Sequence, residues 1–171
     1  STSAKGWKLS QLFAAFLEND DFRNETIRRY NDYMNTIFDK DILSLRLDEM
    51  YNNISHLVAE QKSRYPLSMK NDNRSSIKSQ INSRETTARN EMKETWGVHE
   101  MVNALFISDL SKGYIKVNNI ELCSNNKWQI KNPGNYSAQY YKNIPIEINA
   151  VAENGYKFSY FLINGQKVYD S

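Results

Sequence analysis

Paired carboxylates are the side chains in this sequence best suited to chemistry. Asp20-Asp21 and Asp48-Glu49 could act as general acid and base or hold a Mg²⁺ ion. Both pairs are expected at helix starts or on polar helix faces, where capping and solvation account for acidic residues. We therefore assign no catalytic or metal-binding role to either pair.

The histidine and cysteine residues also give no pattern typical of a catalytic or metal-binding site. His56 and His99 each lack a Cys or Ser neighbour in sequence, and a nucleophile–base pair is recognised by geometry that spacing alone does not supply. Cys123 is the single cysteine, so it has no partner for an internal disulfide or for a zinc site with typical spacing. We expect Cys123 to be a small, half-buried apolar residue.

Glycines and aromatic residues are the next candidates, because glycine-rich loops bind phosphate groups and aromatic rings stack on sugars. The six glycines are isolated, and none opens a helix after a strand, so the sequence contains no phosphate-binding loop. Trp128, Tyr136, Tyr140 and Tyr141 admit two interpretations: they stack on sugars, or they pack in the core and on strand faces. We predict no catalytic, cofactor-binding or metal-binding residue in this chain.

The elements that position these residues change near Lys112. Before it, apolar residues recur at helical spacing; after it, short alternating runs are separated by Gly, Asn and Pro. We predict a short core helix from Trp7, a second after the Asn19-Asp20 cap, a third that starts at a cap of Asp39 and Asp41 and ends near Tyr65-Pro66, and a fourth from the Ser75-Ser76 cap to Gly97. Residues 98–110 are expected to be a short helical or extended piece.

The second half is predicted to be a small antiparallel meander. Asn154-Gly155 and Asn164-Gly165 are typical hairpin turns, because both residues tolerate positive φ. The expected strands are Tyr114–Val117, Ile120–Leu122, Trp128–Ile130, Ile144–Ala152 and Tyr156–Ile163. The sequence thus predicts an α+β fold: a helical subdomain of four or five helices, residues 1–111, followed by a β module, residues 112–171. Trp128, Tyr140, Tyr156, Phe158 and Phe161 should provide its packing mass.

Charge and hydropathy exclude two classes of partner. Residues 1–111 carry 15 Lys and Arg against 16 Asp and Glu, and residues 112–171 carry 7 against 4, so the formal charges are −1 and +3. The basic residues are dispersed, unlike the clusters that follow a phosphate backbone. No apolar run approaches the roughly 18 residues that cross a bilayer. We expect neither nucleic acid binding nor a membrane span.

Residues 9–50, LSQLFAAFLENDDFRNETIRRYNDYMNTIFDKDILSLRLDEM, resemble the C-terminal helical part of the spore-coat CotH family. In that family, a short helix and N-D-x-F-R/K lead into a helix with R-x-x-D-x-M-N-T. The corresponding residues here are Asn19, Asp21, Phe22, Arg23, Arg29, Asp32, Met34, Asn35 and Thr36. The Arg64-Tyr65-Pro66 break and a helix that ends at Trp96-Gly97 continue the resemblance.

The resemblance implies a function for a longer parent protein. CotH-like proteins resemble atypical protein kinases, are secreted or associated with the spore coat, and carry their residues for ATP and Mg²⁺ or Mn²⁺ before the helical part. This chain would then be the distal part of a kinase-like C-lobe, and no position here inherits a catalytic role. Because Ser1 to Gly6 precede the first helix without an initiator Met, we expect an upstream kinase-like region as its partner.

The second half resembles a bacterial surface repeat with G-x-I-x-V/L-N followed by G-Y-x-F and I-N-G. The matching residues are Gly113, Ile115, Val117, Asn118, Tyr141, Pro145, Ile146, Ile148, Ala150, Gly155, Tyr156, Phe158, Ile163, Asn164 and Gly165. The resemblance implies a secreted, cell-surface or spore-coat protein of a Gram-positive organism. The alternative hypothesis is a non-catalytic surface-binding module, whose β part recognises a glycan or protein and whose helices support it.

Overall fold

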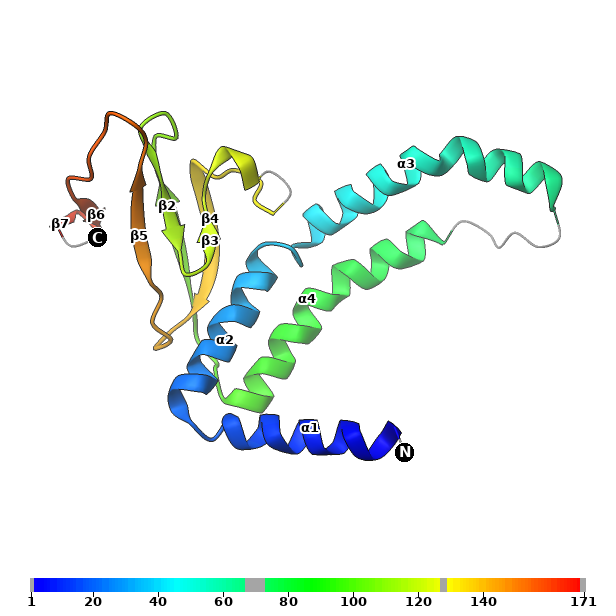
Figure 1. Ribbon diagram of the computed structural model, residues 1–171, viewed down its shortest axis with the longest axis horizontal. Coiled ribbons are helices and arrows are strands. Elements are labelled where there is room, and N and C mark those ends of the chain that lie inside the picture. The colour runs from blue at the N-terminus through cyan, green and yellow to red at the C-terminus, as the bar shows by residue number, and fades with distance from the viewer. Residues whose placement is uncertain (1, 67–72, 127–128, 170–171) are drawn as a thin grey trace.

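The structure, a computed structural model, describes residues 2–66, 73–126 and 129–169. Within these ranges, four helices are followed by short antiparallel strands, which confirms the predicted α+β class (Figure 1). Helix α2 lies between the strands and α4. From this centre, α1 projects to one side, and α3 continues as a long arm beyond the start of α4.

The helices begin and end largely where local signals place them. Asn19 caps α2, because its Oδ1 accepts a 2.9 Å hydrogen bond from the Phe22 amide, and Asp39 caps α3 through the amides of Asp41 and Ile42. Gly97, with φ of 67°, ends α4 as predicted. The bounds are Thr2–Phe16 for α1, Asp20–Asn35 for α2, Lys40–Arg64 for α3 and Arg74–Trp96 for α4.

Two helix predictions need correction. Helix α4 begins at Arg74, just before the predicted Ser75-Ser76 cap, and its N-cap residue Asn73 makes no side-chain cap hydrogen bond. Helix α1 is not a core helix: its large apolar residues from Leu9 to Phe16 are between 46% and 68% exposed. The spacing correctly places these residues on one face, but no described element covers that face.

The strands form three small sheets. Strand β1 (Met101–Ile107) pairs with β4 (Asn135–Tyr141), and β2 (Gly113–Val117) lies between β3 (Ile120–Glu121) and β5 (Ile148–Ala152). Strand β6 (Phe161–Ile163) pairs with β7 (Gln166–Val168). All pairs are antiparallel, and η1 (Ser124–Asn126) is a single 3-10 turn. The first two sheets enclose a common apolar core that includes Phe106, Val117, Ile120, Leu122, Ile130, Tyr136, Ala138 and Tyr140.

This topology differs from the predicted meander. The sequence analysis did not predict β4, and β1 lies on the helical side of the boundary placed at residues 111 and 112. Of the strand predicted at Trp128–Ile130, Trp128 lies outside the described residues, while Ile130 is buried in the core without belonging to a strand. The pairing of β2 with β5 joins segments about thirty residues apart, which local turn signals do not report.

A hairpin was predicted at both Asn-Gly pairs, but the structure has one only at Asn164-Gly165. Asn164 and Gly165, with φ of 48° and 84°, connect β6 directly to β7, so this hairpin is confirmed. At Asn154-Gly155 the chain also turns, and the Tyr156 amide donates to the Glu153 carbonyl over 3.0 Å. No hairpin follows there, because β5 pairs with β2 and the next strand starts only at Phe161. Tyr156 was predicted to pack in the core of the β module, but its side chain is 49% exposed.

Candidate functional site

The helices meet the β strands through a polar cluster within an apolar seam. We call this cluster the junction and define it by Asn31, Asp32, Asn35, Arg89 and Asn118. Four of the five side chains are buried, with exposures of 2% for Asn31, 5% for Asp32, 9% for Arg89 and 6% for Asn118. A second apolar cluster of Ile27, Met92 and Tyr141 packs beside them, with Tyr30 and Trp96 at its edge. The junction therefore joins α2, α4 and the sheets in one packed unit.

Arg89 of α4 organises the first part of the junction. Its guanidinium donates to Asn31 Oδ1 over 3.0 Å and to Asn35 Oδ1 over 3.2 Å, and its Nε donates to Glu85. The amide groups of both asparagines then donate to the Gln139 carbonyl oxygen of β4, each over 2.8 Å. The i, i+4 spacing of the asparagines on α2 places both side chains on one face. One arginine thus orients two amides that hold a strand against the helix.

Asp32 and Asn118 make the second part. Asn118 Nδ2 lies 3.0 and 3.1 Å from the two carboxyl oxygens of Asp32. The Asn118 amide donates to the Glu147 carbonyl over 2.8 Å, and its Oδ1 accepts from the Glu147 amide over 2.9 Å. Burial raises the pKa of Asp32 to about 6, against the opposing influence of the Asn118 hydrogen bond and of Arg28. Among the described carboxyl groups whose shift is resolved, Asp32 is the one whose pKa is raised, whereas the pKa values of Glu25, Asp41 and Asp109 are lowered.

Ion pairs surround the junction at the surface. Arg28 binds Glu25 on its own helix and Glu147, 3.1 Å away, next to β5. Lys131 Nζ lies 2.9 Å from Asp39 and 2.6 Å from Asp41, and hydrogen bonding to Lys131 lowers the pKa of Asp41. Exposed pairs of this kind contribute roughly 0–1 kcal/mol each, so they support the junction without determining its stability.

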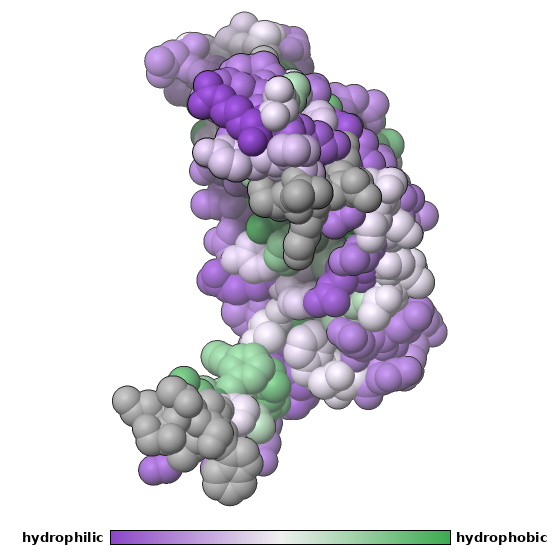
Figure 2. All heavy atoms as spheres, turned by 90° about the vertical axis from the view of Figure 1, so that its right-hand side faces the viewer, coloured by the Kyte–Doolittle hydropathy of each residue, from purple (hydrophilic) through white to green (hydrophobic). Residues whose placement is uncertain are grey.

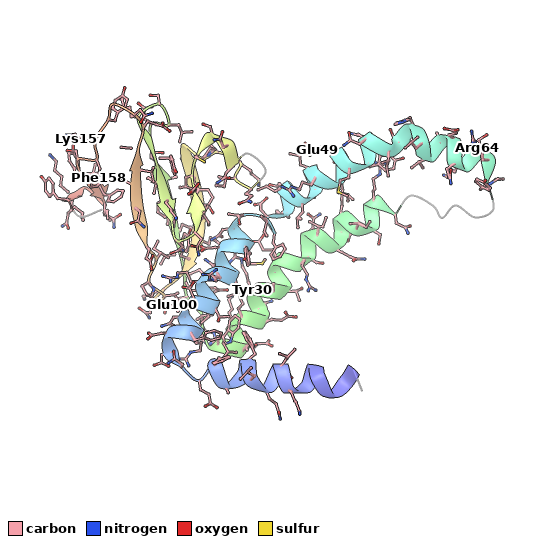
Figure 3. All side chains as sticks on the ribbon, in the orientation of Figure 1. Tyr30, Glu49, Arg64, Glu100, Lys157 and Phe158 are labelled. Atoms are coloured by element: carbon pink, nitrogen blue, oxygen red, sulfur yellow. The ribbon has the colours of Figure 1, made fainter. Side chains whose placement is uncertain are left out.

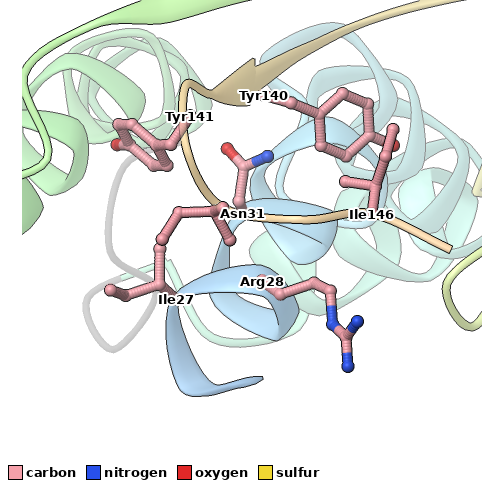
Figure 4. Close-up of a pocket in the computed structure, with 7 residues that line it drawn as sticks. Ile27, Arg28, Asn31, Tyr140, Tyr141 and Ile146 are labelled. Carbon is pink, nitrogen blue, oxygen red and sulfur yellow. The ribbon is translucent and has the colours of Figure 1, made fainter. Parts of the chain in front are cut away.

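The space beside the junction is too small for a substrate. A cavity of about 10 Å³ is lined by residues that include Ile27, Asn31, Tyr140 and Tyr141, and Figure 4 shows them converging from α2 and β4. This volume is enough for about one water molecule. A larger hollow of about 230 Å³, lined by Asp21, Asn24, Glu25, Arg28 and Pro145, is open at the surface. Asp32 lines neither of these two spaces, and its perturbed carboxyl fits a structural role.

The helical part also carries two exposed apolar surfaces. The α1 face consists of Leu9, Leu12, Phe13 and Phe16, which are 68%, 52%, 46% and 50% exposed. Only its end is partly covered, where Phe13 and Phe16 contact the Phe22 ring at centroid distances of 5.9 and 5.4 Å. Figure 2 shows apolar side chains gathered on α1, at the projecting lower end of the molecule.

The α3 face consists of Met50, Ile54 and Leu57, which are 67%, 49% and 52% exposed. Near the start of this face, α3 contacts α4 through the Asp48–Lys78 ion pair and the Arg74 guanidinium over the Tyr51 ring. Beyond Tyr51, α3 extends as an arm, and Figure 3 labels Arg64 at its far end. The other apolar residues at helical spacing on α3 are half-buried: Leu43, Leu47, Tyr51 and Val58.

The residues singled out for chemistry do not come together. Asp20 pairs with Arg23, and Asp48 pairs with Lys78. His56 and His99 are exposed, and Cys123 is half-buried as predicted. No three His, Cys, Asp or Glu side chains gather as a possible metal site in residues 2–66, 73–126 and 129–169.

The aromatic residues considered for sugar stacking are mostly core residues. Tyr136, Tyr140 and Tyr141 are only 5%, 4% and 3% exposed, which confirms the packing interpretation for these three. Trp128 lies outside the described residues. Stacking on a sugar needs an accessible ring face, so these three tyrosines offer no platform.

Sequence reasoning missed the junction, although its residues carry a recognisable signal. Asn31 and Asn35 lie on the same helical side as the buried Ile27 and Met34. Polar residues on the apolar side of a helix require hydrogen-bond partners once they are buried. Their partners, Arg89 and Gln139, are more than fifty and more than one hundred residues away along the chain, so local patterns could not identify them.

Comparison with protein-family models, curated proteins and solved structures found no match to this chain. Separately, no helix in the described part of the chain is both long and apolar enough to span a membrane.

Proposed function

We propose that this chain is the non-catalytic C-terminal part of a CotH-like protein, and that the α1 and α3 faces pack against an upstream kinase-like region. The observation that carries this proposal is the exposure of a regular apolar stripe on α1. Soluble proteins seldom leave such contiguous faces open unless another surface covers them. In this proposal, ATP, Mg²⁺ or Mn²⁺ and phosphorylation of Ser or Thr belong to the upstream region.

The energetics support a covered α1. An isolated helix of about 12–15 residues is marginal in water, and α1 has 15 residues and no acidic residue in its first turn. Fully burying a Leu or Phe side chain contributes roughly 1.5–3 kcal/mol relative to leaving it exposed. Covering the four residues of the α1 face would therefore stabilise the helix by more than an exposed ion pair, which contributes roughly 0–1 kcal/mol.

The proposal also describes what the junction does in the longer protein. Because α2 and α4 pack tightly on the sheets, the helical part and the β part would move as one unit. The kinase-like region would then carry the β part at a fixed place on a secreted, cell-surface or spore-coat protein. Spore-coat proteins, cell-surface proteins and glycans are the partner classes that this location implies.

The first test compares the longer protein with this chain. We expect the longer protein to bind ATP with Mg²⁺ or Mn²⁺, measured by calorimetry, while this chain alone does not. Binding by neither protein would contradict a kinase-like parent. Binding by this chain alone would contradict the non-catalytic assignment.

A second test addresses the docking surface. The upstream region, produced as a separate polypeptide, should associate with this chain, and Leu12→Asp should abolish that association. Gln11→Asp is the matched control, because Gln11 is the adjacent exposed residue outside the apolar stripe. If both variants bind like the unmodified chain, the α1 face is not the docking surface.

The second candidate function is surface recognition by the β part, and one observation favours it. On the β6–β7 hairpin and its flanks, Tyr160 and Tyr169 are 40% and 70% exposed, and their rings lie 5.9 Å apart. Lys167 Nζ lies 4.4 Å from the centre of the Tyr160 ring. We expect any binding to a glycan array or cell-wall preparation to be lost in Tyr169→Ala with the fold intact. Retained binding would exclude this cluster as the recognition site.

A further inference from the structure

The buried carboxyl group of Asp32 has few partners for a charged group. Both oxygens accept from the same donor, Asn118 Nδ2. A buried carboxylate is costly unless several donors or a cation compensate for its lost hydration. The neutral form of Asp32 is therefore favoured in this environment, consistent with the direction of its pKa.

The charges around Asp32 do not reverse this preference. On α2, Arg28 and Arg29 favour the charged form and Glu25 opposes it. On β4, the charge of Asp32 contributes to the raised pKa values of the buried Tyr136 and Tyr140, after burial itself.

The remaining charges near the junction are engaged elsewhere. Glu147, before β5, pairs with Arg28. Arg89 of α4 binds Asn31, Asn35 and Glu85. Burial is therefore the largest influence on the pKa of Asp32, and it raises that pKa.

Asn118 connects this carboxyl to the sheet. It lies between β2 and β3 with a φ of 51°, a left-handed conformation that Asn tolerates better than most residues. Its backbone amide and its Oδ1 are both bonded to the Glu147 backbone, immediately before β5. A change at Asp32 therefore acts on the β2–β3 turn and on the entry to β5 together.

We propose that Asp32 and Asn118 form a pH-sensitive latch between α2 and the central sheet. The Asn118 hydrogen bond itself favours the ionised carboxyl, but one donor does not compensate a buried charge, so ionisation at neutral pH makes the closed junction less stable than the opened one, in which the carboxylate is hydrated. This inference is independent of the proposed docking function, because the latch lies away from the α1 and α3 faces.

The direction of the pH dependence follows from proton binding. The folded protein holds the Asp32 proton up to a pH of about 6, whereas an unfolded aspartate releases it near its ordinary value of 3.8. The contribution of the protonated group is therefore complete below about pH 4 and is lost as the pH rises through about 6. Two pKa units correspond to a change of up to about 100-fold in the opening equilibrium.

The test measures opening of the junction by hydrogen exchange on the full chain between pH 4.5 and 7.5, corrected for the intrinsic pH dependence of exchange. We expect the opening constants for the amides of Asn118 and Leu122 to rise by 10- to 100-fold across this range. Asp32→Asn should remove the rise. Asp41→Asn is the matched control, because Asp41 is exposed, pairs with Lys131 and has a lowered pKa.

A flat profile in the unmodified protein would overturn the latch, as would a profile that Asp32→Asn leaves unchanged. Direct titration of the Asp32 carboxyl carbon by NMR keeps the test decisive if Asp32→Asn fails to fold. A midpoint near 6 supports the latch, and a midpoint near 4 refutes it.

Discussion

The junction and the exposed helical faces use similar helices in opposite ways. At the junction, α2 and the end of α4 bury Ile27, Met34, Ala88 and Met92, and Asn31 donates to the Gln139 carbonyl and accepts from Arg89. On α1 and distal α3, equally apolar residues remain half exposed. The comparison teaches that an apolar stripe identifies which residues share a face, whereas its burial depends on a partner. The apolar residues of the junction are covered by other segments of this chain. We propose that the exposed α1 and α3 faces are covered by the upstream region of the longer protein.

The largest expected difference separates two truncations of apolar side chains. Ile27→Ala should destabilise the protein by about 2–5 kcal/mol, because it removes packed atoms from a fully buried site. Leu12→Ala should cost about 0.5 kcal/mol or less, because Leu12 is 52% exposed. Urea denaturation monitored by circular dichroism measures both values. Equal costs would contradict the contrast between the two regions.

A smaller difference is expected for two arginines. Arg89→Ala should cost about 2 kcal/mol, because it leaves the buried Asn31 Oδ1 without its donor and breaks the contact with Asn35. Arg29→Ala, which removes an exposed pair with Glu25, should cost about 0.5 kcal/mol or less. The same unfolding assay applies. A harmless Arg89→Ala would show that the polar network does not stabilise the junction.

The smallest expected difference concerns the helix caps. Asp39→Ala should cost about 1 kcal/mol, because the Asp39 carboxylate accepts from two amides at the start of α3. Asn73→Ala should be close to neutral, because Asn73 makes no side-chain cap hydrogen bond at the start of α4. Thermal melts of both variants provide the measurement. If Asn73→Ala is the more harmful change, the assignment of the caps is wrong.

The helical part shows how far local patterns reach. Period 3.6 and the capping residues Asn19, Asp39 and Gly97 predict the helices well, because helical hydrogen bonds and caps are local. The same pattern could not reveal that the α1 stripe faces solvent, since that depends on packing between distant segments. For the same reason, the contact between Asp32 and Asn118, 86 residues apart, was not predictable from spacing.

In the β part, two strand pairings, β1 with β4 and β2 with β5, join distant segments, and neither pairing was predicted from the sequence. Its one confirmed hairpin, at Asn164-Gly165, is also its most local pairing. Strand β4 is not among the predicted strands, although Tyr136, Ala138 and Tyr140 alternate with polar residues as expected for a strand with one buried face. The sequence predicts β1 only as a short helical or extended piece, because its pairing with β4 spans a long connection without a local turn signal. Sheets built from distant segments need tertiary contacts that a single sequence does not display.

The most direct test of this account is hydrogen exchange on the chain alone and within the longer protein. The account predicts that amides of α1 and distal α3 exchange rapidly in the chain alone and become protected in the longer protein. Amides of α2 and β4 at the junction should be equally protected in both. Unchanged exchange of α1 in the longer protein would contradict the claim that its apolar face is a docking surface.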